Sequence, residues 1–88
     1  MKLNENFVLR QVAGTWVVLP LKGDTLNFNG MIRLNDSGAM LWKSLEQGGD
    51  REKLVQALTS QYEVAAEQAS RDVDEFLEML VKAGCLEI

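Results

Sequence analysis

The sequence predicts an α+β domain in which a three-stranded antiparallel sheet is followed by three helices. Short runs rich in valine, leucine and aromatic residues occur within the first 34 positions, which is typical of strands. After residue 35, apolar side chains recur every three or four positions, which indicates amphipathic helices. A chain of 88 residues is the size of one small domain, so we expect a single domain over residues 1–88.

The first two strands are expected at Phe7 to Val12 and Thr15 to Leu21. Only Ala13 and Gly14 separate them, and a two-residue connection with a glycine available for positive φ favours a hairpin. Pro20 has no N–H for a strand ladder, so we expect it at a sheet edge or near a strand end.

A third strand is expected from Leu26 to Leu34, after a turn at residues 22–24. The asparagines and the glycine before Met31 are poor strand formers, so the best-formed part is Met31 to Leu34. Within it Ile32 and Leu34 share one face, because successive side chains of a strand point to opposite sides.

The first helix is expected over Asp36 to Glu46. Asn35, Asp36 and Ser37 can each accept hydrogen bonds from the free amides of its first turn, and Gly48-Gly49 is a usual termination site. Leu41, Trp42 and Leu45 recur at helical spacing within it.

The second helix is expected to start after Asp50, and the third to span Ala66 to Ala83 with Gly84 ending it. The apolar tail Cys85, Leu86 and Ile88 should fold back on the core. The residues expected to face inward are Leu54, Ala57, Leu58 and Tyr62 in the second helix and Ala66, Ala69, Val73, Phe76, Leu77 and Leu80 in the third.

The charge is uneven along the chain, whose net charge is −4. Residues 1–34 hold four basic and two acidic side chains, whereas residues 35–88 hold five basic and eleven acidic ones. An acidic helical surface repels phosphate, so nucleic-acid binding is disfavoured. No apolar run is long enough to span a membrane, no secretory signal is visible, and the single cysteine excludes an internal disulfide, so we expect a cytoplasmic protein.

The residues argue against catalysis. There is no histidine, which excludes imidazole bases and histidine metal sites, and Cys85 is best explained as a small buried hydrophobe. Four carboxylates of the third helix, which would suit paired acids or a divalent ion, are better explained as a solvated polar face: Asp72, Asp74, Glu75 and Glu78. We therefore expect no catalytic residue, no metal site and no cofactor.

Binding by strand addition is better supported, because a three-stranded sheet exposes edges whose N–H and C=O groups can pair with an extended peptide. If Gly30 to Leu34 is such an edge, the third helix is a candidate wall beside it. Asp72, Phe76 and Met79 lie along one flank of its buried stripe. Met79 is either a singly exposed apolar residue or, with Phe76, part of an adaptable groove.

Two motifs carry a family resemblance. A strand ending in Leu34-Asn35 is followed by acidic and hydroxyl residues, the small pair Gly38-Ala39 and Trp42. In the third helix, residues 71–77 alternate acidic and apolar side chains before a Phe-Leu pair, and Leu80, Ala83-Gly84 and Leu86 follow at the usual spacing. From Phe7 to Leu86 the chain resembles the PqqD family of small peptide-binding domains, also called RiPP recognition elements.

The resemblance implies a winged helix-turn-helix-like topology and a non-catalytic function. Such domains hold the leader of a ribosomally made precursor peptide for a modifying enzyme, commonly a radical SAM maturase, and the leader pairs with the third strand beside the third helix. Arg33 either pairs with an acidic leader residue or is a solvated strand residue. Carried onto this chain, the peptide-binding residues are Met31, Ile32, Arg33, Leu34, Asp72, Val73, Phe76, Leu77 and Met79.

The sequence departs from the family pattern at two places. Ala65 stands where relatives often carry a capping residue for the third helix, and residues 26–30 look like a branch separate from the quinone-cofactor pathway. Two other functions stay open: a winged-helix DNA-binding regulator, and a structural subunit whose exposed strand serves homodimerisation. The charge of the third helix argues against DNA binding, since this helix holds five acidic and two basic residues.

Overall fold

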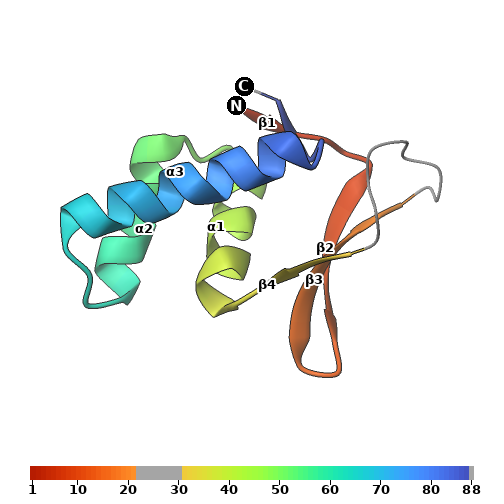
Figure 1. Cartoon of the computed structure of the whole chain (residues 1–88), viewed down its shortest axis with the longest axis horizontal. Helices are drawn as coiled ribbons and strands as arrows, with labels where there is room; N and C mark the ends of the chain where they lie inside the picture. The colour runs from red at the N-terminus through yellow and green to blue at the C-terminus, as the bar shows by residue number, and fades with distance from the viewer. Residues whose placement is uncertain (22–30, 88) are drawn as a thin grey trace.

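The computed structural model describes residues 1–21 and 31–87, and the α+β fold is confirmed. Figure 1 shows the helices on one side of the molecule, the three-stranded sheet on the other, and the two termini close together at the top of the view. The elements are β1 (Lys2–Leu3), β2 (Phe7–Val12), β3 (Thr15–Pro20), β4 (Ile32–Leu34), α1 (Asp36–Glu46), α2 (Arg51–Gln61), α3 (Ala66–Lys82) and β5 (Leu86–Glu87).

The predicted hairpin is confirmed as β2 paired antiparallel with β3, with Val12 opposite Thr15. Both connecting residues have positive φ, 51° at Ala13 and 82° at Gly14, as a type I′ turn requires. Pro20 lies at the strand end, opposite Phe7.

The turn fixes which backbone groups of β3 face which neighbour. The pair that flanks a two-residue turn is hydrogen-bonded, and bonded and non-bonded pairs alternate along an antiparallel ladder. Val17, two residues after Thr15, therefore directs its N–H and C=O toward β2, whereas Trp16 and Val18 direct theirs toward β4.

β4 pairs antiparallel with β3 and is an edge strand of the sheet order β2-β3-β4. Leu34 lies opposite Trp16 and Ile32 opposite Val18, so these two residues of β4 bond to β3. Arg33, opposite Val17, is left with its N–H and C=O pointing away from the sheet. The expected earlier part of this strand, residues 26–30, and the turn at 22–24 lie outside the described residues.

Short-range capping explains the helix boundaries. The Oδ1 atom of Asn35 accepts the Gly38 N–H at 2.8 Å, and a carboxylate oxygen of Asp50 accepts the Lys53 N–H at 2.9 Å, so α1 and α2 begin as predicted. α3 begins after Ala65, which offers no side-chain cap. Gly48 and Gly84 both have positive φ and end α1 and α3.

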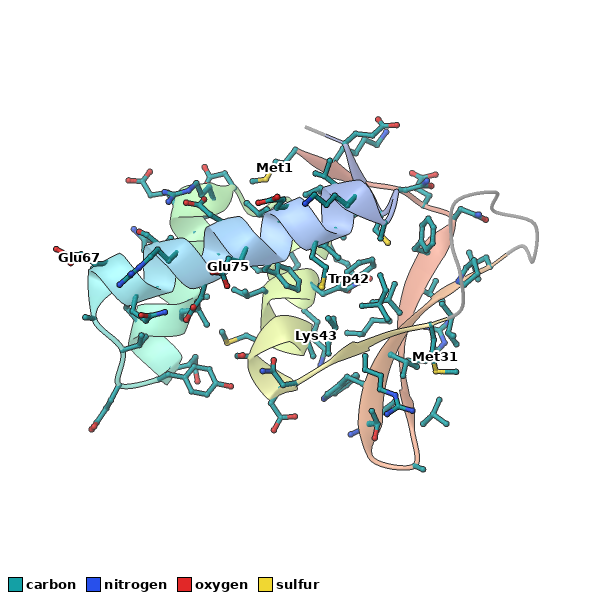
Figure 2. All side chains as sticks on the ribbon, in the orientation of Figure 1. Met1, Met31, Trp42, Lys43, Glu67 and Glu75 are labelled. Atoms are coloured by element: carbon teal, nitrogen blue, oxygen red, sulfur yellow. The ribbon has the colours of Figure 1, made fainter. Side chains whose placement is uncertain are left out.

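One core joins the sheet to the helices, and Trp42 in α1 is 1% exposed near its centre (Figure 2). The expected inward positions of Tyr62 and Ala66 are wrong, and Ala57 is only partly buried and lies outside the core. Tyr62 is 42% exposed because it follows the last residue of α2 with an extended backbone, which breaks the helical period. Ala66 is exposed because the buried stripe of α3 begins one turn later, at Ala69.

The C-terminal tail folds back as predicted, with Cys85 and Leu86 buried; Ile88 lies outside the described residues. The sequence did not indicate that β5 pairs with β1 in a separate two-stranded sheet. Strands of two residues are too short to show a period. Within residues 1–21 and 31–87, no helix has the length and apolar character needed to cross a membrane.

Candidate functional site

A groove of about 430 Å³ lies between the end of β4, the start of α1 and one flank of α3. It is the place where the open edge of the sheet meets the helices. The residues that line it are Arg33, Leu34, Asn35, Ser37, Gly38, Leu41, Leu58, Asp72, Glu75, Phe76 and Met79.

The wall formed by β4 and α1 is held by local contacts. The Oδ1 atom of Asn35 accepts hydrogen bonds from the Gly38 N–H and, at 2.9 Å, from the Ser37 hydroxyl. A Cβ on Gly38 would lie 3.2 Å from that Oδ1 and 3.3 Å from the Leu34 Cβ. The absence of a side chain at Gly38 therefore lets the first turn of α1 approach the end of β4 closely.

The α3 wall consists of Asp72, Glu75, Phe76 and Met79, at the i, i+3, i+4 and i+7 positions of one helix flank. Phe76 is 9% exposed and Met79 is 37% exposed, so the apolar floor of the groove opens toward solvent at Met79. Figure 2 shows Glu75 midway along α3.

The structure brings five of the nine expected site residues together in this groove: Arg33, Leu34, Asp72, Phe76 and Met79. Val73 and Leu77 are 0% and 7% exposed and pack in the core behind the α3 wall. Met31 is 55% exposed near the start of β4, away from Glu75 in Figure 2, and Ile32 is half-buried against the core.

The side chain of Arg33 lies on the face of the sheet opposite the groove. Ile32 packs against the core and Leu34 is buried in it, so alternation places Arg33 on the outer face, together with Val17 and Arg10, which are in register with it. Arg33 therefore contributes its backbone to the groove, while its guanidinium lies beside the outer face.

Four of the five acidic residues of α3 fall into two groups. Asp74, away from the groove, is 2.6 Å from Arg51, and this hydrogen bond lowers the pKa of the carboxyl. Glu78 is likewise 2.8 Å from Lys82, which lowers its pKa. By contrast, Asp72 and Glu75 in the groove have no basic partner within the described part of the chain; Asp72 accepts a hydrogen bond only from the Gln68 amide, at 2.8 Å.

The described residues offer no cluster of three His, Cys, Asp or Glu side chains that could hold a metal ion. Burial raises the pKa of the Cys85 thiol to about 11, which keeps it protonated near neutral pH. The groove itself offers backbone hydrogen bonds, apolar contacts and carboxylates, which are groups suited to binding a peptide.

Sequence reasoning missed several lining residues, including Glu75, Leu41 and Leu58. Glu75 could have been found, because it shares a helix flank with Asp72, Phe76 and Met79. Leu41 and Leu58 look like ordinary core positions, and only the packing of α1 and α2 brings them to the groove.

The family model for coenzyme PQQ synthesis protein D (PqqD) matches residues 15–86. This chain belongs to the PqqD family. The match includes β3, β4 and the three helices, and therefore both walls of the groove. No curated protein sequence matches this chain significantly.

Two solved structures share the fold of this PqqD-family chain over nearly its whole length. One is described as TbiB1 in complex with the TbiA(beta) leader peptide; it is 28% identical, with a TM-score of 0.81 over 99% of this chain and 95% of that chain. The other, lasso peptide synthetase B1 complexed with the leader peptide, is 26% identical, with a TM-score of 0.77 over 96% of this chain and 93% of that chain.

Proposed function

We propose that this protein binds the leader segment of a ribosomally made precursor peptide and presents it to a modifying enzyme, without catalysing the modification itself. The observation that carries the proposal is the outward-facing backbone of Arg33 on edge strand β4, directly beside the groove. Membership of the PqqD family and the leader-peptide complexes of its two structural neighbours support the same function.

The proposed mechanism is strand addition. An extended leader pairs with Arg33, which supplies sequence-independent backbone hydrogen bonds. Every second side chain of the leader then points into the groove, where Leu34, Phe76 and Met79 provide apolar contacts. Met31, two residues before Arg33, lies along the same edge, and Ile32 holds this edge in place through its bonds to β3. Val73 and Leu77 support the α3 wall from the core.

Calorimetric titration with a synthetic leader, taken from a short precursor gene adjacent to this gene, tests the proposal. We expect binding at micromolar or lower Kd, equivalent to about −8 kcal/mol or more favourable. Met79→Asp should weaken binding, whereas Val81→Asp is the matched control, since both side chains lie on α3 with similar exposure, 37% and 39%. Absence of binding at high protein concentration would reject the function.

The partner enzyme is proposed to be a radical SAM maturase. The proposed location is the cytoplasm, because the buried cysteine Cys85 is a free thiol and a reducing compartment suits it. Co-purification of a radical SAM enzyme encoded near this gene with this protein, with and without leader, tests the partnership. A maturase that modifies its full precursor at the same rate without this protein would contradict it. Homodimerisation stays a prediction that light scattering with and without leader can test.

DNA binding is the less favoured alternative. The exposed side of α3 carries acidic residues, and Lys82, one of its two basic residues, is paired with Glu78. Because phosphate contacts dominate such affinity, this helix is a poor recognition helix. A low-salt gel shift with mixed-sequence duplex should show no complex.

A further inference from the structure

The charges around the groove differ on the two faces of β4. On the groove side, Asp72 and Glu75 lack a basic partner among the described residues, although Asp74 and Glu78 on the other flank of α3 each have one. On the outer side, the exposed guanidinium of Arg33 has no carboxylate partner among the described residues.

A strand added to β4 would meet both faces at once. Its alternate side chains point to opposite sides, so one set faces Asp72 and Glu75 and the other lies beside Arg33. Cross-strand neighbours of opposite charge stabilise pairing, and like charges directly opposite destabilise it.

We infer that the peptide recognised by this groove carries a basic side chain facing α3 and an acidic side chain facing outward beside Arg33, separated by an odd number of positions. This inference rests on the proposed function and names the class of peptide that the site selects. The same charges would also determine how the added strand aligns with β4. A slip of one residue would bring acid toward acid and base toward base, so the charges fix the register of the added strand.

Fixing the register matters for presentation to an enzyme. A slip of two residues along a strand moves the chain by about 6.6 Å, so a backbone-only interaction would deliver the modification site at several positions. The acidic pair on α3 and Arg33 on β4 would restrict the peptide to one of them.

Selection from a phage-displayed library of random dodecapeptides tests the inference on the intact protein. Wild-type protein should enrich peptides with Lys or Arg at an odd separation from Asp or Glu. Glu75→Lys should reverse the preference at the basic position, and Arg33→Glu should reverse it at the acidic position. The controls are Glu67→Lys, which Figure 2 places at the far end of α3, and Lys2→Glu on β1, which belongs to the other sheet; both should retain the wild-type preference.

A selected peptide then provides a quantitative test. Its Kd should rise about tenfold with Glu75→Lys, and replacing its basic residue by glutamate should restore binding to that variant. If peptides are enriched without charges at odd separation, or if the charge reversals leave the preference unchanged, the inference is wrong while peptide binding stands. If the wild-type protein, shown by circular dichroism to be folded, enriches no peptide, then the proposed function itself fails.

Discussion

Substitution of Arg33 by proline removes the one backbone donor of β4 that points away from the sheet. Ile32 and Leu34 bond to β3, so proline at either position would disrupt the sheet itself. At Arg33 the lost N–H belongs to no strand ladder among the described residues, and proline is tolerated at such edge positions. The substitution therefore tests guest pairing separately from folding.

The expected loss of leader-binding free energy has two parts: the missing backbone hydrogen bond and the leader carbonyl that is left without a donor. A typical hydrogen bond contributes about 1 kcal/mol net, and a partner carbonyl left buried without a donor costs about 1–3 kcal/mol. The loss of leader-binding free energy should therefore be about 2–4 kcal/mol, which raises Kd by roughly 30-fold or more. Loss of the guanidinium is measured separately by Arg33→Ala, which keeps the N–H.

Fluorescence anisotropy with a labelled leader measures the Kd, and thermal unfolding followed by circular dichroism verifies the fold. Gln11→Pro is a matched control, because Gln11 is exposed and its N–H points outward from β2, the opposite edge of the same sheet. It should leave leader binding unchanged. Wild-type affinity in folded Arg33→Pro would refute strand addition at β4.

Three further predictions concern stability. Ala65 is the uncapped N-cap of α3 with φ −66° and ψ 148°, so Ala65→Asp should stabilise the protein by about 1 kcal/mol, which thermal unfolding measures; an unchanged midpoint would contradict the missing cap. Ala13 has φ 51°, so Ala13→Asn should raise the free energy of unfolding in urea by about 1 kcal/mol, whereas Ala13→Val should lower it. Burial raises the pKa of Cys85 from 9.0 to about 11, so the stability from the neutral thiol is complete below pH 9 and is lost as the pH rises to 11. This loss is about 2 kcal/mol, and urea unfolding should show it in wild type but not in Cys85→Ala; equal losses in both proteins would contradict it.

Local signals were sufficient to predict most of the fold. The Ala13-Gly14 turn, the acceptor at Asn35 and the glycine after α3 each act through neighbours a few residues away, and their structures agree with prediction. The expected burial of Tyr62 is wrong because α2 ends one residue before it, so the helical period does not reach this position. The β1–β5 pairing joins the two ends of the chain, and no local pattern reports it.

The strand and the helix that form the groove could be predicted from the sequence, but the groups that they expose to it could be predicted only in part. Alternation along β4 and the helical period of α3 were sufficient to place Leu34, Phe76 and Met79 near one another once the family topology was assumed. The pairing of β4 with β3 and of Asp74 with Arg51 depends on tertiary structure. Without these contacts, one can deduce neither the outward backbone of Arg33 nor the lack of a basic partner for Glu75 among the residues that the structure describes.

Amide hydrogen exchange at β4, measured by NMR residue by residue, tests most directly whether this edge is open to a guest strand. In the free protein, the Arg33 amide should exchange much faster than those of Ile32 and Leu34, which bond to β3. Saturation with leader should slow exchange at Arg33 and leave the protection of its two neighbours in place. An Arg33 amide that is protected before any peptide is added, or that stays unprotected in the complex, would contradict the account.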